Sequence, residues 1–174
     1  INKELSIYSF SDIETVVIKN ILQSAGIKKV KNRLIANILK RNVNDGVSFW
    51  FSTKGIFPDL ELLEKLYELN VAEEDRKVNG SYYTPTGVVS YIVKNTIIDD
   101  VGSICDPACG SGAFLVESAK FVKQKSNLSY SRIFEELLFG VDILPTSVER
   151  TKIMLSLLAI LNGEDKDFSF NLCE

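Results

Sequence analysis

The first 70 residues carry apolar side chains at helical spacing, and no run alternates as a half-buried strand does. Between positions 13 and 22 the apolar residues fall mostly on one face, so we expect a helix capped by Ser11-Asp12 and ending near Gly26. A second apolar stripe covers 34–39 and is broken by the turn-prone stretch 42–46. Pro58-Asp59 opens a third helix that continues to Leu69. This pattern predicts a small helical domain.

From Gly80 the pattern changes to strands that alternate with helices, which is typical of a doubly wound parallel sheet. The predicted strands cover 101–105, 138–143 and 168–172. The predicted helices cover 87–98, with Thr86 as the N-cap, and 112–125, 129–138 and 147–161. The charged stretch 71–79 has no large apolar residues other than valines, and we interpret it as a linker. We therefore expect a helical domain, 1–77, followed by part of an α/β domain, 78–174.

The most specific feature of the chain is the segment 104–115, which reads ICDPACGSGAFL. A short apolar run ends in Asp106, a turn of small residues follows, and an amphipathic helix begins. Gly110 and Gly112 allow the main chain to approach a ligand closely, and the helix N-terminus offers unpaired N–H groups. A carboxylate at the end of a strand favours a ligand with ammonium or hydroxyl donors over a pyrophosphate. The segment also lacks the third glycine of the dinucleotide fingerprint, where Leu115 stands, and the lysine of a phosphate-binding loop.

A second carboxylate, Asp142, ends the next predicted strand, where the ligand crevice of such a sheet opens. The two oxygens of a carboxylate can accept hydrogen bonds from both hydroxyl groups of a ribose. An aspartate at the end of a strand can equally cap the helix that follows it. Because the glycine-containing segment lies upstream, we favour the ribose interaction.

Three segments, in this order, resemble the start of an N6-adenine DNA methyltransferase of restriction–modification systems. They are GSYYTPTGVV at 80–89, DPACGSG at 106–112 and LFGVDI at 138–143. The resemblance covers about residues 78–172 and implies the first part of a Rossmann-like sheet that binds S-adenosylmethionine. By this resemblance, the residues lining the cofactor site would be Tyr83, Thr84, Pro85, Asp106, Ala108, Cys109, Gly110, Gly112, Asp142 and Ile143.

The resemblance also implies a role for most of these residues. Asp106 would bind the methionine ammonium, and Ile143 would pack on the adenine. Thr84 would meet the methionine carboxylate, with Pro85 biasing it to an extended backbone. Ala108 and Cys109 would contribute backbone contacts. A large side chain at either glycine of the loop would block the ligand.

The residues that transfer the methyl group in this family, an Asn/Asp-Pro-Pro-Tyr segment, are not found in the chain. Its four prolines are all isolated, so no Pro-Pro pair occurs. Both ends of the chain look cut, and we expect the catalytic segment beyond Glu174. The chain would then be inactive alone, while the parent would methylate DNA through regions mostly outside it, together with a specificity or restriction subunit. The alternatives are an S-adenosylmethionine enzyme acting on RNA, protein or a small molecule, and a non-catalytic module that binds cofactor or a subunit.

Composition narrows the remaining chemistry. The chain has no histidine, which excludes Ser-His-Asp and Cys-His catalysis, and its three cysteines do not have the spacing of zinc ligands. We therefore expect no metal site. We also expect a cytoplasmic protein with reduced cysteines, because no apolar run reaches membrane-spanning length and no signal peptide is visible. The net charge of −3 gives no global attraction to nucleic acid. We interpret the basic residues Lys28, Lys29, Lys31, Arg33, Lys40 and Arg41 as a solvated helix face rather than a DNA contact. We likewise assign the aromatic run 49–51 to the helical core rather than to a site for flipped bases.

Overall fold

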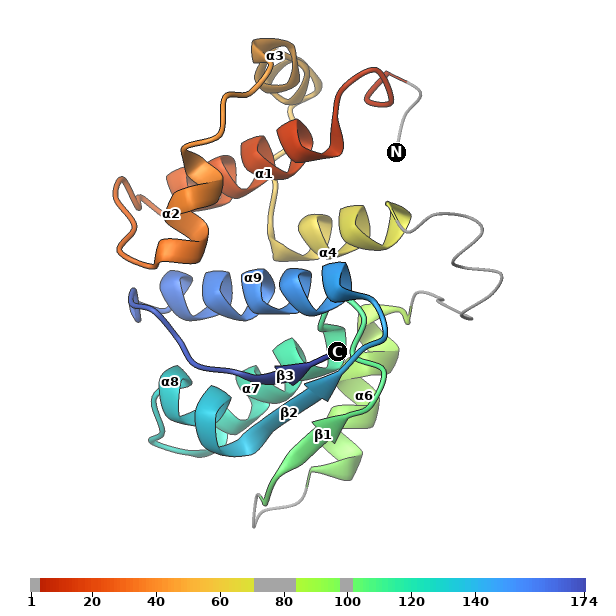
Figure 1. Ribbon diagram of the computed structural model, residues 1–174, viewed down its shortest axis with the longest axis vertical. Coiled ribbons are helices and arrows are strands. Elements are labelled where there is room, and N and C mark those ends of the chain that lie inside the picture. The colour runs from red at the N-terminus through yellow and green to blue at the C-terminus, as the bar shows by residue number, and fades with distance from the viewer. Residues whose placement is uncertain (1–3, 71–83, 98–101) are drawn as a thin grey trace.

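The computed structural model describes residues 4–70, 84–97 and 102–174. Four helices form a layer at the top of Figure 1: α1 (Phe10–Ser24), α2 (Arg33–Leu39), α3 (Asp45–Lys54) and α4 (Leu60–Leu69). Below them α9 (Pro145–Leu161) lies between this layer and a sheet with its own helices. The expected combination of N-terminal helices and a parallel α/β part is confirmed. None of the described helices is long and apolar enough to cross a membrane.

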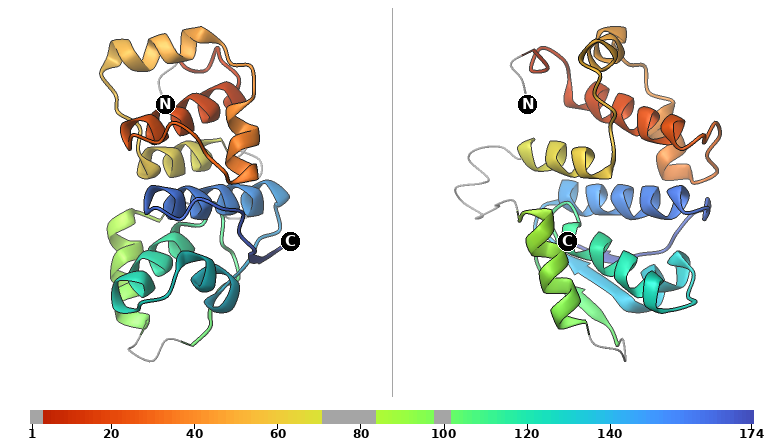
Figure 2. Two further views of the ribbon diagram at one scale, coloured as in Figure 1. Left: turned by 90° about the vertical axis from the view of Figure 1, so that its left-hand side faces the viewer. Right: turned by 180° about the vertical axis from the view of Figure 1, so that it is seen from behind.

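The α/β part contains three parallel strands in the order β1 (Ile104–Asp106), β2 (Leu138–Val141) and β3 (Asn171–Cys173). Asp106 pairs in register with Gly140, and Gly140 pairs with Leu172. The remaining elements are α6 (Thr86–Thr96), α7 (Ala113–Lys125), the single turn α8 (Tyr130–Arg132) and the π-helical turn η1 (Ile133–Leu137). In the left-hand view of Figure 2, α6 and α7 lie on one side of the strands.

The two faces of the sheet differ in exposure. Along β2, Leu138 and Gly140 are buried, whereas Phe139 is 37% exposed and Val141 is 36% exposed. On the exposed face they are joined by Cys105 and Cys173, both of which are exposed. Parallel sheets are normally covered on both faces. Within the described part of the chain, the second face has no such cover.

Several predicted boundaries are wrong by a few residues. The cap of α1 is Ser9, whose Oγ accepts a hydrogen bond from the Asp12 N–H at 3.1 Å, and not Ser11-Asp12. Thr86 is the first residue of α6 rather than its N-cap, a position that Pro85 occupies. The third strand begins at Asn171 rather than 168, because Phe168 and Phe170 instead pack on the ring of Phe134, each at 5.4 Å between centroids.

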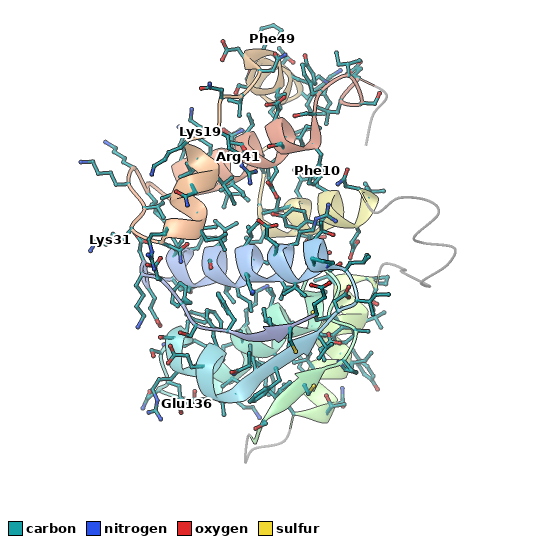
Figure 3. All side chains as sticks on the ribbon, in the orientation of Figure 1. Phe10, Lys19, Lys31, Arg41, Phe49 and Glu136 are labelled. Carbon is teal, nitrogen blue, oxygen red and sulfur yellow. The ribbon has the colours of Figure 1, made fainter. Side chains whose placement is uncertain are left out.

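The sequence pattern missed α3 entirely. Asn44 caps this helix by accepting a hydrogen bond from the Gly46 N–H, and Gly55 ends it with a left-handed backbone at φ 61°. The aromatic run that it carries is only partly in the core. Phe51 is 3% exposed, whereas Phe49 is 70% exposed and protrudes at the top of the molecule (Figure 3).

One buried apolar cluster extends from the N-terminal helices through α9 to α7 and β2. Within it α9 is buried on several faces, as expected for a helix whose side chains are apolar all round. The predicted domain boundary between residues 77 and 78, and the linker at 71–79, lie outside the described residues. The division into two domains therefore stays a prediction.

Candidate functional site

The candidate site lies at the carboxyl edge of the sheet. β1 and β2 point toward the same end of the molecule, at which α6, α7 and α9 all begin (Figure 1). Because parallel strands are joined by helices, the loops that follow their carboxyl ends gather at one edge. Asp106 at the end of β1 and Asp142 just after β2 are thereby brought to the two sides of the glycine-containing loop 107–112.

Backbone hydrogen bonds hold this loop against the second strand. The Cys109 N–H donates to the carbonyl of Val141 at 2.9 Å, and the Gly112 N–H donates to the carbonyl of Cys109 at 2.8 Å. Gly110 and Gly112 have φ angles of 53° and 93°. These left-handed values are costly for any residue with a Cβ.

The two glycines face different surroundings. A Cβ at Gly110 would meet no atom within 4 Å, so open space lies on that side of the loop. A Cβ at Gly112 would lie 2.9 Å from Cγ2 of Thr151 in α9. The missing side chain at Gly112 therefore permits close packing of the loop on α9, whereas only Gly110 borders space that a ligand can occupy.

Asp142 fixes the loop from the side of β2. Its Oδ2 accepts a hydrogen bond from the Gly110 N–H at 2.9 Å, and its Oδ1 accepts one from the Leu144 N–H at 2.9 Å. The second bond closes the turn before α9. It is not the helix cap that we weighed against ribose binding, because Leu144 is the N-cap of α9 and no side-chain hydrogen bond caps that helix. Each oxygen keeps a further lone pair, and the side chain is half-buried. The two hydrogen bonds thus leave acceptor capacity for a ligand, and ribose binding stays a prediction.

Asp106 faces the loop from β1. Its Oδ1 accepts a hydrogen bond from the Ala108 N–H at 3.1 Å. Burial raises the pKa of this carboxyl, the Ala108 hydrogen bond opposes that rise, and the negative charge of Asp142 adds to it. The two carboxylates therefore lie close enough to influence each other. A ligand cation between them would relieve both the burial cost and their mutual repulsion.

Cys109 is buried beneath the loop, and burial raises the pKa of its thiol to about 11. The thiol is therefore protonated at neutral pH, which suits a packing residue that presents its backbone and is unsuited to a nucleophile.

The other predicted site residues differ in exposure, and one of them is not described. Tyr83 lies outside the described residues. Thr84 is half-buried and Pro85 is exposed, and the carbonyl of Pro85 accepts hydrogen bonds that start α6. Ala108 is exposed, and the large apolar side chain of Ile143 is 68% exposed.

Two residues that the sequence reasoning missed support this site. The Thr151 hydroxyl, fully buried in α9, donates to the carbonyl of Gly110 at 2.9 Å. Gly140 in β2 leaves room for Leu115, since a Cβ there would lie 2.8 Å from Cδ1 of Leu115. A threonine within an apolar helix and a glycine within a strand were the available signals.

Elsewhere, a cavity of about 510 Å³ lies between α2, α9 and the segment before β3, lined by residues that include Arg33, Lys152 and Phe168. None of the residues that line it belongs to the loop 107–112, and neither Asp106 nor Asp142 lines it. Among the residues that the structure describes, no group of three or more His, Cys, Asp or Glu side chains could hold a metal ion.

Comparison with known proteins gives a consistent result. Residues 59–170 match the family described as N-6 DNA Methylase. The type I restriction enzyme MjaVII methylase subunit of Methanocaldococcus jannaschii is 37% identical over 91 residues, which cover 51% of this chain and 14% of that protein. The type I restriction enzyme HindI methylase subunit of Haemophilus influenzae is 29% identical over 112 residues, which cover 62% of this chain and 23% of that protein.

Among solved structures, a modification subunit of a putative type I restriction enzyme from Vibrio vulnificus is similar with 25% identity and a TM-score of 0.41, over 67% of this chain and 25% of that one. The chain spans between 14% and 23% of the length of the curated relatives named above. The resemblance drawn from the three sequence segments is confirmed. Because the family match covers well over half of its residues, the chain belongs to the N-6 DNA methylase family.

Proposed function

We propose that the chain supplies the S-adenosylmethionine-binding part of an enzyme that methylates the N6 amine of adenine in DNA within a restriction–modification system. The observation that carries this proposal is the open space at Gly110, bordered by two carboxylates at the ends of neighbouring strands. Family membership supports it, since the N-6 DNA methylases use this cofactor. Association with a specificity or restriction subunit belongs to the same proposal, because the matched relatives are named as methylase subunits.

The residues present fit the cofactor. Asp106 has an oxygen with no hydrogen bond from the described backbone, and it can accept one from the methionine ammonium. Asp142 offers its remaining lone pairs to the ribose hydroxyls. The exposed side chain of Ile143 presents an apolar surface for the adenine. Thr84 and Pro85, with Tyr83, precede α6 and would close over the methionine end.

When bound, the cofactor supplies the methyl group. The residues of this chain bind and orient it, and the main chain at the loop keeps the site free of side-chain bulk. The acceptors for the adenine amine would come from the Asn/Asp-Pro-Pro-Tyr segment, which the 174 residues do not contain. We therefore expect the chain alone to bind cofactor and to transfer no methyl group. Methylation of DNA by the isolated chain would contradict this expectation.

Calorimetric titration of S-adenosylmethionine into the chain tests the site. The sharpest variant is Ile143→Ala, because this side chain is 68% exposed and its loss leaves the core intact. We expect the binding free energy to weaken by up to about 1.5 kcal/mol, the lower end of the range for burying a large apolar side chain, with unchanged thermal stability. Phe57→Ala, at a residue 85% exposed and far along the chain, is the matched control that should not alter affinity.

Asp142→Ala should weaken binding further, by about 1–3 kcal/mol, the range for losing a charged hydrogen-bond partner. This variant also releases the Gly110 and Leu144 N–H groups, so its stability has to be measured in parallel. Equal affinity of wild type, Ile143→Ala and Asp142→Ala would remove this edge of the sheet as the cofactor site.

A further inference from the structure

Positive charge is concentrated in one segment of this acidic chain. Residues 15–44 contain seven of the 20 lysines and arginines and none of the 23 aspartates and glutamates. Because the whole chain has a net charge of −3, the remainder has a net charge of −10. From the sequence we interpreted most of these residues as a solvated helix face. An ordinary solvated face mixes both signs, whereas α1, α2 and their connection carry one sign here, so we revise that interpretation.

In the structure, five of these side chains are free ammonium groups. Lys19, Lys28, Lys29, Lys31 and Lys40 are all exposed and make no ion pair or side-chain hydrogen bond with any residue that the structure describes. Figure 3 shows Lys19 and Lys31 on the same flank of the helical layer.

Two further lysines extend this surface onto α9 and the segment before β3. Lys152 of α9 lines the cavity of about 510 Å³ together with Arg33. The carbonyl of Lys166 accepts a hydrogen bond from the Asn32 side chain at 2.7 Å. Neither ammonium group is paired within the described residues. We call the surface formed by these two and the five free lysines the basic flank.

Two carboxylates of the segment before β3 hold the connection between α1 and α2 in place. Asp165 accepts hydrogen bonds from the backbone N–H groups of Lys31 and Asn32, at 2.8 and 2.9 Å. Asp167 accepts one from the Arg33 N–H at 2.7 Å and forms an ion pair with its guanidinium. These contacts pin residues 31–33 to 165–167, so the connection before α2 is fixed while the lysine side chains stay in solvent.

The composition of the surface indicates its partner. No large apolar side chain between 15 and 44 is exposed, whereas protein interfaces have an apolar core and are depleted in lysine. Interfaces with nucleic acid are polar and strongly positive. Both arginines of the segment are already occupied, Arg33 by Asp167 and Arg41 by Glu14, so no free guanidinium is left to read a guanine.

We propose that the basic flank binds the sugar–phosphate backbone of duplex DNA without reading its sequence. The choice of DNA among polyanions rests on the proposed function, while the surface itself is independent of the cofactor site. Apart from Lys152, which follows the loop-contacting Thr151 in α9, the flank lies toward the end of α9 opposite to the glycine-containing loop. A helix of this length spans about 25 Å, or roughly seven base pairs of duplex. The flank would therefore hold DNA beside the modified base rather than at it.

Fluorescence anisotropy with labelled 20-base-pair duplexes, without S-adenosylmethionine, tests the proposal over a range of salt concentrations. We expect two duplexes of unrelated sequence to bind equally well. Each lysine–phosphate contact contributes about −0.9 to the slope of log affinity against log salt. Lys28→Gln/Lys29→Gln/Lys31→Gln should therefore make the slope shallower by up to about 2.7 and weaken binding at low salt at least tenfold. Lys54→Gln/Lys65→Gln/Lys94→Gln, with the same loss of charge elsewhere, should bind as wild type does.

Unchanged binding by the first triple variant would overturn the proposal, as would an equal loss in the control. Tighter binding to double-stranded RNA of the same length, or to polyglutamate, would contradict the choice of DNA and identify that polyanion as the partner instead. A strong preference for one duplex sequence would contradict backbone contact. Since no cofactor is present, a failure here leaves the cofactor site untouched, and a failure of cofactor binding leaves this result standing.

Discussion

The two glycines of the loop have different surroundings: Gly110 borders open space, and Gly112 packs against Thr151 of α9. Replacing each with alanine tests whether the first matters for ligand binding and the second for stability. Both have left-handed backbones, so either substitution costs about 1–2 kcal/mol in backbone strain. At Gly110 nothing lies within 4 Å of the new Cβ, and no further cost arises in the folded chain. At Gly112 the Cβ would lie 2.9 Å from Thr151, and overpacking adds about 1–3 kcal/mol.

We therefore expect Gly112→Ala to lower the free energy of unfolding by about 2–5 kcal/mol and Gly110→Ala by about 1–2 kcal/mol. Urea denaturation, with equal slopes for all variants, measures these values. Calorimetry with S-adenosylmethionine should give the opposite order, because only the Cβ at Gly110 enters the open side of the loop. A double variant, Gly112→Ala/Thr151→Ser, removes the colliding methyl and should be more stable than Gly112→Ala alone.

Two results would refute this reasoning. Equal loss of stability at the two glycines would mean that Thr151 does not confine Gly112. Full cofactor affinity in Gly110→Ala would mean that the open space beside this residue is not where the ligand binds.

Other consequences concern α9 and α4. Thr151→Val removes the hydroxyl that donates to the carbonyl of Gly110 at 2.9 Å, and it should lower the free energy of unfolding in urea by about 1–2 kcal/mol. Ser156→Ala removes a buried hydroxyl with no partner among the described residues, and it should lower that free energy by less. Arg150→Lys keeps the charge but loses stacking on two aromatic rings, and should lower the unfolding midpoint. Burial, with the charge of Glu64, raises the pKa of Glu68 to about 7. The folded state thus holds this proton more tightly than the unfolded state, whose carboxyl has a pKa of 4.5. Stability should therefore fall as pH rises from 4.5 through about 7, and Glu68→Gln should flatten that fall.

The location of the site was readable from the sequence because its signals are local. A strand that ends in an acid, a turn of small residues and a helix start depend on neighbours in the chain, and Asp106 and Asp142 lie at the strand ends as predicted. The surroundings of each glycine could not be predicted from the sequence. Gly112 packs against Thr151, some 40 residues later, and the apolar pattern of α9 gave no indication of that contact.

Errors at helix ends have a similar origin. Ser9 and Ser11 are both competent caps, and the choice of Ser9 brings Phe10 into α1, where its ring packs 6.0 Å from that of Tyr67. The stretch 42–46 was interpreted as a break because asparagine, aspartate and glycine favour turns. Asn44 uses the same side-chain chemistry to start a helix. Tertiary packing decides between these outcomes.

Two neighbouring residues of α9 explain why the helical layer and the loop form one physical unit. Arg150 donates to the carbonyl of Tyr67 in α4 at 3.0 Å and stacks on the rings of Tyr67 and Phe10. Thr151, the next residue, lies about 100° further around the helix and donates to the carbonyl of Gly110 in the loop. Because a helix is rigid over one turn, a displacement of α4 that moves Arg150 also moves Thr151.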